Sequence, residues 1–204
     1  LQRMNHEAYG QHPGVMTIAE ESTAFPGVSK PTSTGGLGFG FKWNMGFMHD
    51  TLQYMARDAI HRKHHHNDLT FGLLYAFSEN FVLPLSHDEV VHGKSPMIYK
   101  MPGNEWEQFA NLRLLYSWMF THPGAKLLFM GNEFGQTSEW NYKSELDWEL
   151  LQHDSHNKLQ ECVRALNYLL RTEPAMYEYQ FNRKGFEWVS LDHRQEGIIA
   201  FKRK

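Results

Sequence analysis

The sequence predicts an α/β fold built from parallel strand–helix units. Short runs of apolar and β-branched residues alternate with longer stretches of helical periodicity along the first 180 residues. Runs that are apolar throughout are typical of strands buried on both faces, as in a parallel sheet. Their regular alternation with helices favours βα units over an all-α or all-β domain.

The strands are predicted from compact apolar runs bounded by polar or turn-forming residues. These runs cover residues 15–19, 81–85 and 125–130, and residues 39–43 form a weaker candidate. The strong runs end at their carboxyl side in polar or acidic segments, which marks the point where each strand gives way to a loop.

The helices are predicted from apolar residues spaced three and four apart, which gives elements over 48–59, 109–120 and 159–170. His122-Pro-Gly closes the second helix before the next strand. Asp154 or Ser155 is the expected N-cap of the third, since both residue types accept from free backbone N–H groups.

The pattern changes after about residue 180. Residues 186–191 and 198–201 flank a polar turn and read as an antiparallel hairpin. A two-stranded hairpin is marginally stable alone. We therefore expect residues 1–180 to form one unit and 181–204 to begin a separate antiparallel β domain. Because the chain begins at Leu1 rather than Met, we also expect it to be processed or part of a longer protein.

The composition excludes several classes of protein. The 204 residues carry a formal charge of −3, which gives a nucleic-acid partner little electrostatic support. The 41% apolar content rules out a disordered chain, and no apolar run reaches the roughly 18 residues of a membrane span. One cysteine, Cys162, favours a reducing compartment, so we expect a cytoplasmic protein without a membrane partner. No strand is followed by a Gly-rich phosphate loop, and we expect no cofactor.

Acidic residues follow three of the predicted strands: Glu20, Asp88 and Glu133. The carboxyl ends of the strands in a βα-barrel converge on one face, where the active site lies. Acids placed there are expected to share a pocket in which one is protonated and another anionic. The alternative is that they are helix-capping residues, because acids also favour helix N-termini.

Several segments, in order, resemble the glycogen branching enzymes of the α-amylase superfamily. Residues 17–23 with 25–31 resemble the acid-bearing segment of that family, and 83–94 its later His-Asp motif. Smaller matches complete the series at 36–39, 42–44, 127–134 and 139–141. The resemblance covers essentially the whole chain. It implies the C-terminal half of a TIM (β/α)8 barrel, about strands five to eight, followed by the start of a β domain.

The resemblance also implies a function. The family cleaves an α-1,4 bond in a glucan and transfers the freed chain to a 6-hydroxyl, with retention of configuration. Glu20 matches the general acid, Asp88 the transition-state stabiliser and His87 a neighbouring imidazole that hydrogen-bonds the same sugar. The implied partner is an α-1,4-glucan such as glycogen.

Other residues have secondary roles in this interpretation. Glu21 follows Glu20 directly, and because successive strand residues point to opposite sides, only one of the two can face the pocket; the family pattern selects Glu20. Trp43 is a candidate for stacking on a glucose ring, although an aromatic at a strand end is as often simple packing. His92 and Glu133 are further candidates for substrate binding, each expected to support loop geometry more than to touch sugar.

One expected part of the site has no counterpart here. The family's nucleophilic Asp lies earlier, on the fourth barrel strand, in a segment that does not occur in this sequence. We therefore expect the chain alone to be inactive and to need the remainder of the same enzyme. Two alternatives stay open: an α-1,4-glucan hydrolase of the same superfamily, which uses the same acids, and a non-catalytic glucan-binding fragment.

Two further groups of residues carry weaker signals. Residues 61–66 contain four histidines, and histidines four apart share a helix face and can bind zinc. A solvated polar helix end is the simpler interpretation, and no metal site is expected. Cys162 falls on the apolar stripe of a predicted helix, which indicates packing rather than catalysis.

Overall fold

The computed structural model describes residues 1–204 and contains two sheets. The larger is a parallel sheet in the order β1-β2-β3-β4, made of Ile18–Ala19, Phe41–Trp43, Phe81–Leu85 and Ala125–Leu128. Each strand pairs in register with the next along the chain. Sequential parallel strands, joined by helical connections, form one half of a βα-barrel, as expected.

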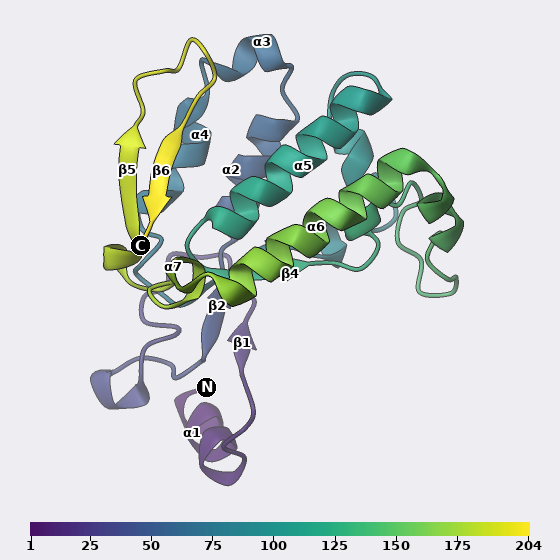
Figure 1. The fold of residues 1–204 in the computed structure, drawn as a ribbon. Helices are drawn as coiled ribbons and strands as arrows, with labels where there is room; N and C mark the ends of the chain where they lie inside the picture. The colour runs from purple at the N-terminus through teal and green to yellow at the C-terminus, as the bar shows by residue number, and fades with distance from the viewer.

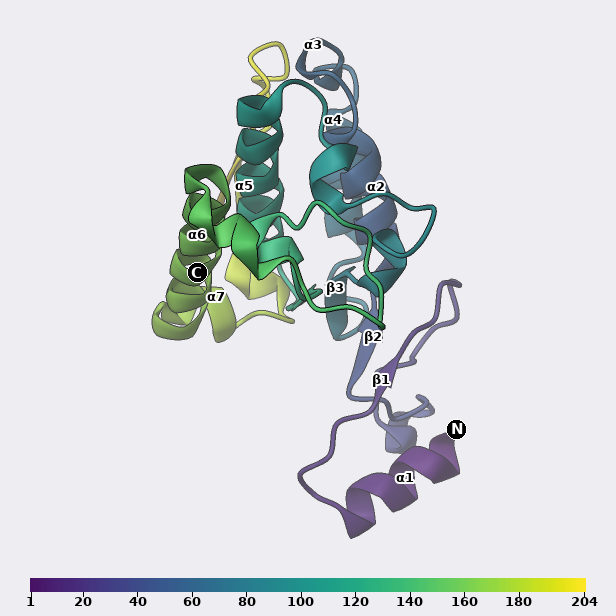
Figure 2. The same ribbon diagram turned by 90° about the vertical axis from the view of Figure 1, so that its right-hand side faces the viewer.

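The helices pack on one side of the sheet. The long ones are α2 (Met45–Met55), α5 (Glu105–Thr121) and α6 (Asp154–Thr172). Figure 1 shows α5 and α6 lying side by side, and Figure 2 shows α2 beside α5. Short helices connect these elements: α3 (Ala59–Arg62), α4 (His66–Thr70) and α7 (Pro174–Tyr177).

The main core lies between this helical layer and β3. All five residues of β3 are buried, and Leu83 and Leu85 are fully enclosed against the helices. The cluster contains 17 buried residues, mainly from α2, β3, α5 and α6 and from the segment after β3. Strand β3 therefore lies against the core with a paired strand on each side, whereas β1 and β4 form the two edges of the sheet.

The amino-terminal helix α1 (Gln2–Gln11) projects from the rest of the molecule together with β1 (Figures 1 and 2). The sequence pattern does not predict this helix, because its apolar residues are few and irregularly spaced. It is held by polar contacts instead. Asn5 is buried and its Nδ2 donates to Leu37 O at 2.8 Å, and Tyr9 Oη accepts from Thr17 N at 3.0 Å.

The hairpin forms a second sheet, from β5 (Phe186–Ser190) and β6 (Ala200–Arg203). The second strand begins two residues later than predicted, and the pairing is irregular between Trp188 and Ser190. The hairpin contacts the helical layer: Phe201 packs edge-on against Trp118 of α5, with ring centroids 5.7 Å apart, and Arg203 Nη1 donates to Thr121 O at 2.9 Å.

Other boundaries differ from the predictions by a few residues. The first strand is only Ile18–Ala19, because its neighbour β2 starts at Phe41 and offers no longer partner. The prediction that Asp154 or Ser155 caps α6 was wrong: His153 is the capping residue, and Asp154 lies in the first turn, where it pairs with Lys158. His122 ends α5 as predicted.

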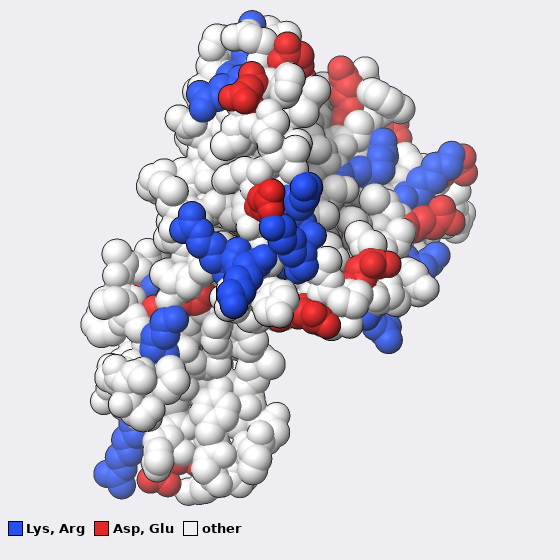
Figure 3. Space-filling view, turned by 60° about the vertical axis from the view of Figure 1, so that its left-hand side comes forward, with Lys and Arg blue, Asp and Glu red and all other residues white.

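Charges of both signs cover the surface. On the face shown in Figure 3, lysine and arginine side chains gather near the middle of the view and acidic side chains lie among and around them. None of the helices combines the length and the apolar character needed to cross a membrane.

Candidate functional site

Glu20 follows the last residue of β1 directly and is exposed. It borders a hollow of about 440 Å³ on the open face of the sheet, together with Ile18, Phe41 and Trp43. The lining is otherwise mainly apolar and includes Val82 and, from β4, residues 125–127, of which Lys126 is charged. Because Glu20 is exposed at a strand end, its carboxyl group can reach a ligand that lies in this hollow.

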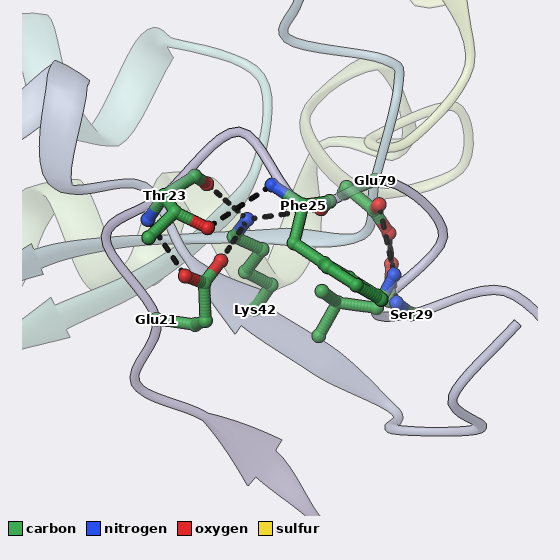
Figure 4. Close-up of polar contacts among 7 residues, drawn as sticks. Glu21, Thr23, Phe25, Ser29, Lys42 and Glu79 are labelled. Atoms are coloured by element: carbon green, nitrogen blue, oxygen red, sulfur yellow. Dashed lines mark hydrogen bonds and ion pairs between the residues drawn. The ribbon is translucent and has the colours of Figure 1, made fainter. Parts of the chain in front are cut away.

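Glu21 lies toward a different part of the molecule. Its carboxylate pairs with Lys42 Nζ at 2.6 Å, and its Oε1 accepts from Thr23 N at 2.7 Å (Figure 4). The hydrogen bond from Lys42 lowers the pKa of Glu21 to about 2. Glu21 and Lys42 border a hollow of about 700 Å³ that does not include Glu20. The one hollow that both glutamates border is a third one, at the sheet edge. The pair thus separates as strand alternation predicts.

The second predicted acid, Asp88, sits in a short turn after β3. Its side chain is half exposed, and its Oδ1 lies 3.2 Å from His87 Nε2. The His87 ring packs against Phe129 and Trp140, at centroid distances of 5.9 and 6.0 Å. His87 is therefore held by aromatic neighbours and directed at Asp88, which suits a pair acting on one ligand.

The turn that carries these two residues is closed by its own side chains. Ser86 Oγ accepts from Asp88 N at 3.2 Å, and Glu89 Oε2 accepts from Ser86 N at 2.5 Å. Both Ser86 and Glu89 are buried. This reciprocal capping arrangement fixes the backbone of Asp88 through residues of the turn itself.

His92 and Glu133 have contacts that organise loops. His92 is fully exposed, and its Nδ1 lies 3.4 Å from Glu139 Oε2. Glu133 Oε2 accepts from Gly131 N at 2.7 Å and so closes its own turn. Neither side chain borders the hollow that contains Glu20 or the one that contains Asp88.

Glu139, which belongs to the segment 139–141, is a positioning residue that no sequence pattern indicates. Its two carboxylate oxygens accept from Ser95 N at 2.8 Å and from Gly93 N at 3.0 Å. These backbone hydrogen bonds lower the pKa of Glu139. Ser95 has a φ of +69°, which non-glycine residues rarely adopt, so Glu139 holds a turn that the local sequence alone does not favour.

The predicted acids do not share a pocket within this chain. Asp88 borders a hollow of about 550 Å³ beside α2 together with Lys94 and Lys100, apart from the one with Glu20. The reason is geometric. Strand β2 lies between β1 and β3, so the two strand ends are separated by about 10 Å of sheet, and these strands bound the site from one side only.

The remaining candidate groups from the sequence are spread out. In the histidine cluster His66 is buried, His65 lies 3.9 Å from Asp68, and His61 and His64 are exposed. No three side chains of histidine, cysteine, aspartate or glutamate converge as a metal site would require. Cys162 is half-buried on α6, and burial raises the pKa of its thiol.

The chain is similar to curated bacterial proteins along its whole length, although no family model matches it. It is 61% identical over 204 residues to the 1,4-alpha-glucan branching enzyme GlgB 1 of Rhizobium etli, and 59% identical over 203 residues to the 1,4-alpha-glucan branching enzyme GlgB of Mesorhizobium japonicum. Both matches take in the whole chain and 28% of the relative. The chain thus spans little more than a quarter of the relatives' length.

Solved structures agree on the fold. An alpha-amylase from H. orenii superposes with a TM-score of 0.62 at 14% identity, over 100% of this chain and 43% of that one. At that identity the likeness concerns the fold alone, and it covers about half of a barrel protein. The chain is therefore similar over its whole length to a part of the 1,4-alpha-glucan branching enzymes, and it has the fold of somewhat less than half of the alpha-amylase chain.

Proposed function

We propose that this chain is part of an α-glucan branching enzyme, which cleaves an α-1,4-glucosidic bond and transfers the freed chain to a 6-hydroxyl. The observation that carries the proposal is the 61% identity over all 204 residues to a relative of that name. It is supported by the position of Glu20 and Asp88 directly after β1 and β3 of one parallel sheet. The carboxyl ends of barrel strands are where active sites form.

Glu20 is proposed as the general acid. It protonates the leaving 4-oxygen and then, as base, takes the proton of the incoming 6-hydroxyl, which a retaining mechanism requires of one residue. Its neighbour Glu21 is unsuited to this role, because a carboxylate paired with Lys42 at 2.6 Å is held as the anion. Trp43 borders the same hollow as Glu20 and is proposed to pack on a glucosyl ring.

Asp88 is proposed to stabilise the positive charge that develops on the sugar in the transition state. His87, 3.2 Å from Asp88, is proposed to hydrogen-bond the same sugar. His92 and Glu133 are proposed as supporting residues of the substrate-binding face, through the loops that their side chains hold.

The nucleophile is proposed to come from the remainder of the same enzyme. A retaining glycosidase needs two carboxylates about 5–5.5 Å apart. Glu20 is the one acidic residue that lines the hollow it shares with Trp43. We further propose that the enzyme serves glycogen biosynthesis in the cytoplasm, and that the barrel part ends near residue 180, before the β5–β6 sheet.

The test is an assay of the full-length enzyme and of the isolated 204-residue chain on amylose. For the full-length enzyme we expect new α-1,6 branches with no rise in reducing ends; for the chain alone we expect no turnover. A rise in reducing ends without branches would instead identify a hydrolase. Glycogen binding by a full-length protein without turnover would identify a binding protein. Turnover by the purified chain alone would overturn the assignment of the nucleophile to the remainder.

A further inference from the structure

The segment that follows Glu20 has no regular secondary structure, yet its backbone is tightly held. Thr23 N donates to Glu21 Oε1, and Thr23 O and Phe25 O accept from Lys42 Nζ at 2.9 and 3.5 Å. The same Nζ pairs with Glu21 at 2.6 Å. Figure 4 shows the Lys42 amine enclosed by these groups. One ammonium therefore binds three places in the five residues that follow Glu20.

Lys42 is placed to do this by the sheet. It lies in the middle of β2 and is directly paired with Ala19, the residue before Glu20. Only 5% of Lys42 is exposed, which is unusual for a lysine. Lys42 thus fixes the backbone on both sides of Glu20. Its backbone pairs with Ala19 before Glu20, and its ammonium binds residues 21–25 after it.

We propose that Lys42 is a positioning residue for the general acid, acting through the backbone on either side of Glu20. The inference rests on the proposed function, in which Glu20 transfers the proton. Proton transfer requires the carboxyl to be within hydrogen-bond reach of the glycosidic oxygen, and a displacement of about 1 Å costs on the order of 100-fold in rate. A fixed backbone limits such displacement of a side chain that is itself exposed.

A second buried residue provides the comparison. Glu79 accepts from Val28 N at 3.0 Å and from Ser29 N at 2.7 Å, further along the same loop (Figure 4). Glu79 holds the loop through hydrogen bonds to Val28 and Ser29, whereas the hydrogen bonds of Lys42 are to residues 23 and 25. If Lys42 acted only by supporting the loop, the two residues would have the same effect on catalysis. If it positions Glu20, only Lys42 should affect the chemical step strongly.

The experiment uses the full-length enzyme with Lys42→Met, Lys42→Arg, Glu79→Gln and Lys158→Met. Lys158→Met is the matched control, since it breaks an exposed lysine–aspartate pair of 3.0 Å on α6. For Lys42→Met we expect a fall in kcat of about 10- to 100-fold, KM within about threefold, and faster hydrogen exchange at residues 21–25. Lys42→Arg, which retains the charge, should recover most of kcat, and the control should match wild type.

Three results would overturn the inference: a folded Lys42→Met enzyme with wild-type kcat, a loss confined to KM, or an equal kcat loss in Glu79→Gln. If Lys42→Met does not fold, Glu21→Gln decides the question, because it removes only the ion pair. It should lower kcat by about three- to tenfold at constant KM, and an unchanged kcat would reject the role. A wild-type enzyme without branching activity would refute the proposed function instead, so the two failures are distinct.

Discussion

The ends of β1 and β3 carry the two acids proposed for catalysis, but they are built in opposite ways. The turn after β3 is held by its own residues, Ser86 and Glu89, and follows a strand whose residues are all buried. The loop after β1 follows a two-residue edge strand and is held by Lys42 and Glu79, which are distant in sequence. Similar strand ends can thus be held either through local capping or through anchors that are distant in sequence.

The largest expected effect tests whether the β1 end carries the acid. Glu20→Gln in the full-length enzyme should lower the branching rate by about 10²–10⁴-fold, since it removes the transferable proton. Circular dichroism and thermal unfolding should remain unchanged, because Glu20 is exposed. Near-normal activity in Glu20→Gln together with an inactive Glu21→Gln would show that the wrong member of the pair was chosen.

The corresponding change at the β3 end is Asp88→Asn. It should lower kcat by about 10²–10³-fold and change KM much less, because the lost anion acts mainly on charge that develops in the transition state. Steady-state kinetics on amylose measures the two constants separately. A normal kcat with a raised KM would demote Asp88 to a substrate-binding residue and would leave only the β1 end as catalytic.

The anchors themselves can be compared by stability. Glu79→Ala removes the acceptor for Val28 N, Ser29 N and Ser29 Oγ, and leaving buried donors unpaired costs about 1–3 kcal/mol each. We expect local unfolding of residues 26–30 to become easier by about 2–4 kcal/mol, measured by hydrogen exchange. Unchanged protection there would mean that the loop after β1 does not depend on its distant anchor.

Ser86→Ala is the matching change in the self-capped turn. It removes the acceptor of Asp88 N, and loss of such a capping hydroxyl costs about 1 kcal/mol. The backbone N–H of residue 86 is unchanged by the substitution and still donates to Glu89. The turn should therefore persist, with modestly faster hydrogen exchange at residues 86–89. A larger effect than that of Glu79→Ala would reverse the proposed contrast between local and distant anchoring.

The smallest expected effect is a pH dependence confined to the β1 end. The pKa of Glu21 is lowered to about 2 from 4.5 by its bond with Lys42. Because the pKa is lower in the folded state, the pair stabilises the loop at pH values above the pKa of Glu21 in the unfolded chain. This contribution is lost as the pH falls from about 5 toward 2. The difference in hydrogen-exchange protection of Thr23 between wild type and Glu21→Gln should therefore shrink on acidification. A difference independent of pH would show that Glu21 contributes by packing.

The sequence was sufficient where the determining interactions are local. The five-residue strand at 81–85 was predicted with its bounds, because an uninterrupted apolar run has one simple explanation in a parallel sheet. The end of α5 at His122 followed from the Pro-Gly after it. The separation of Glu20 from Glu21 followed from strand alternation and agrees with the bonds of Glu21 to Lys42 and Thr23, while Glu20 borders the hollow with Trp43; the two residues share only the hollow at the sheet edge. The catalytic roles remain predictions.

What the sequence did not determine depends on residues far apart in the chain. Helix α1 was missed because polar contacts of Asn5 and Tyr9, rather than an apolar stripe, hold it in place. The roles of Lys42 and Glu79 were invisible because a lone lysine or glutamate in a sequence gives no sign of the backbone groups that it will bind. Only the tertiary structure brings β2 beside β1 and so places the Lys42 ammonium on the loop that follows Glu20.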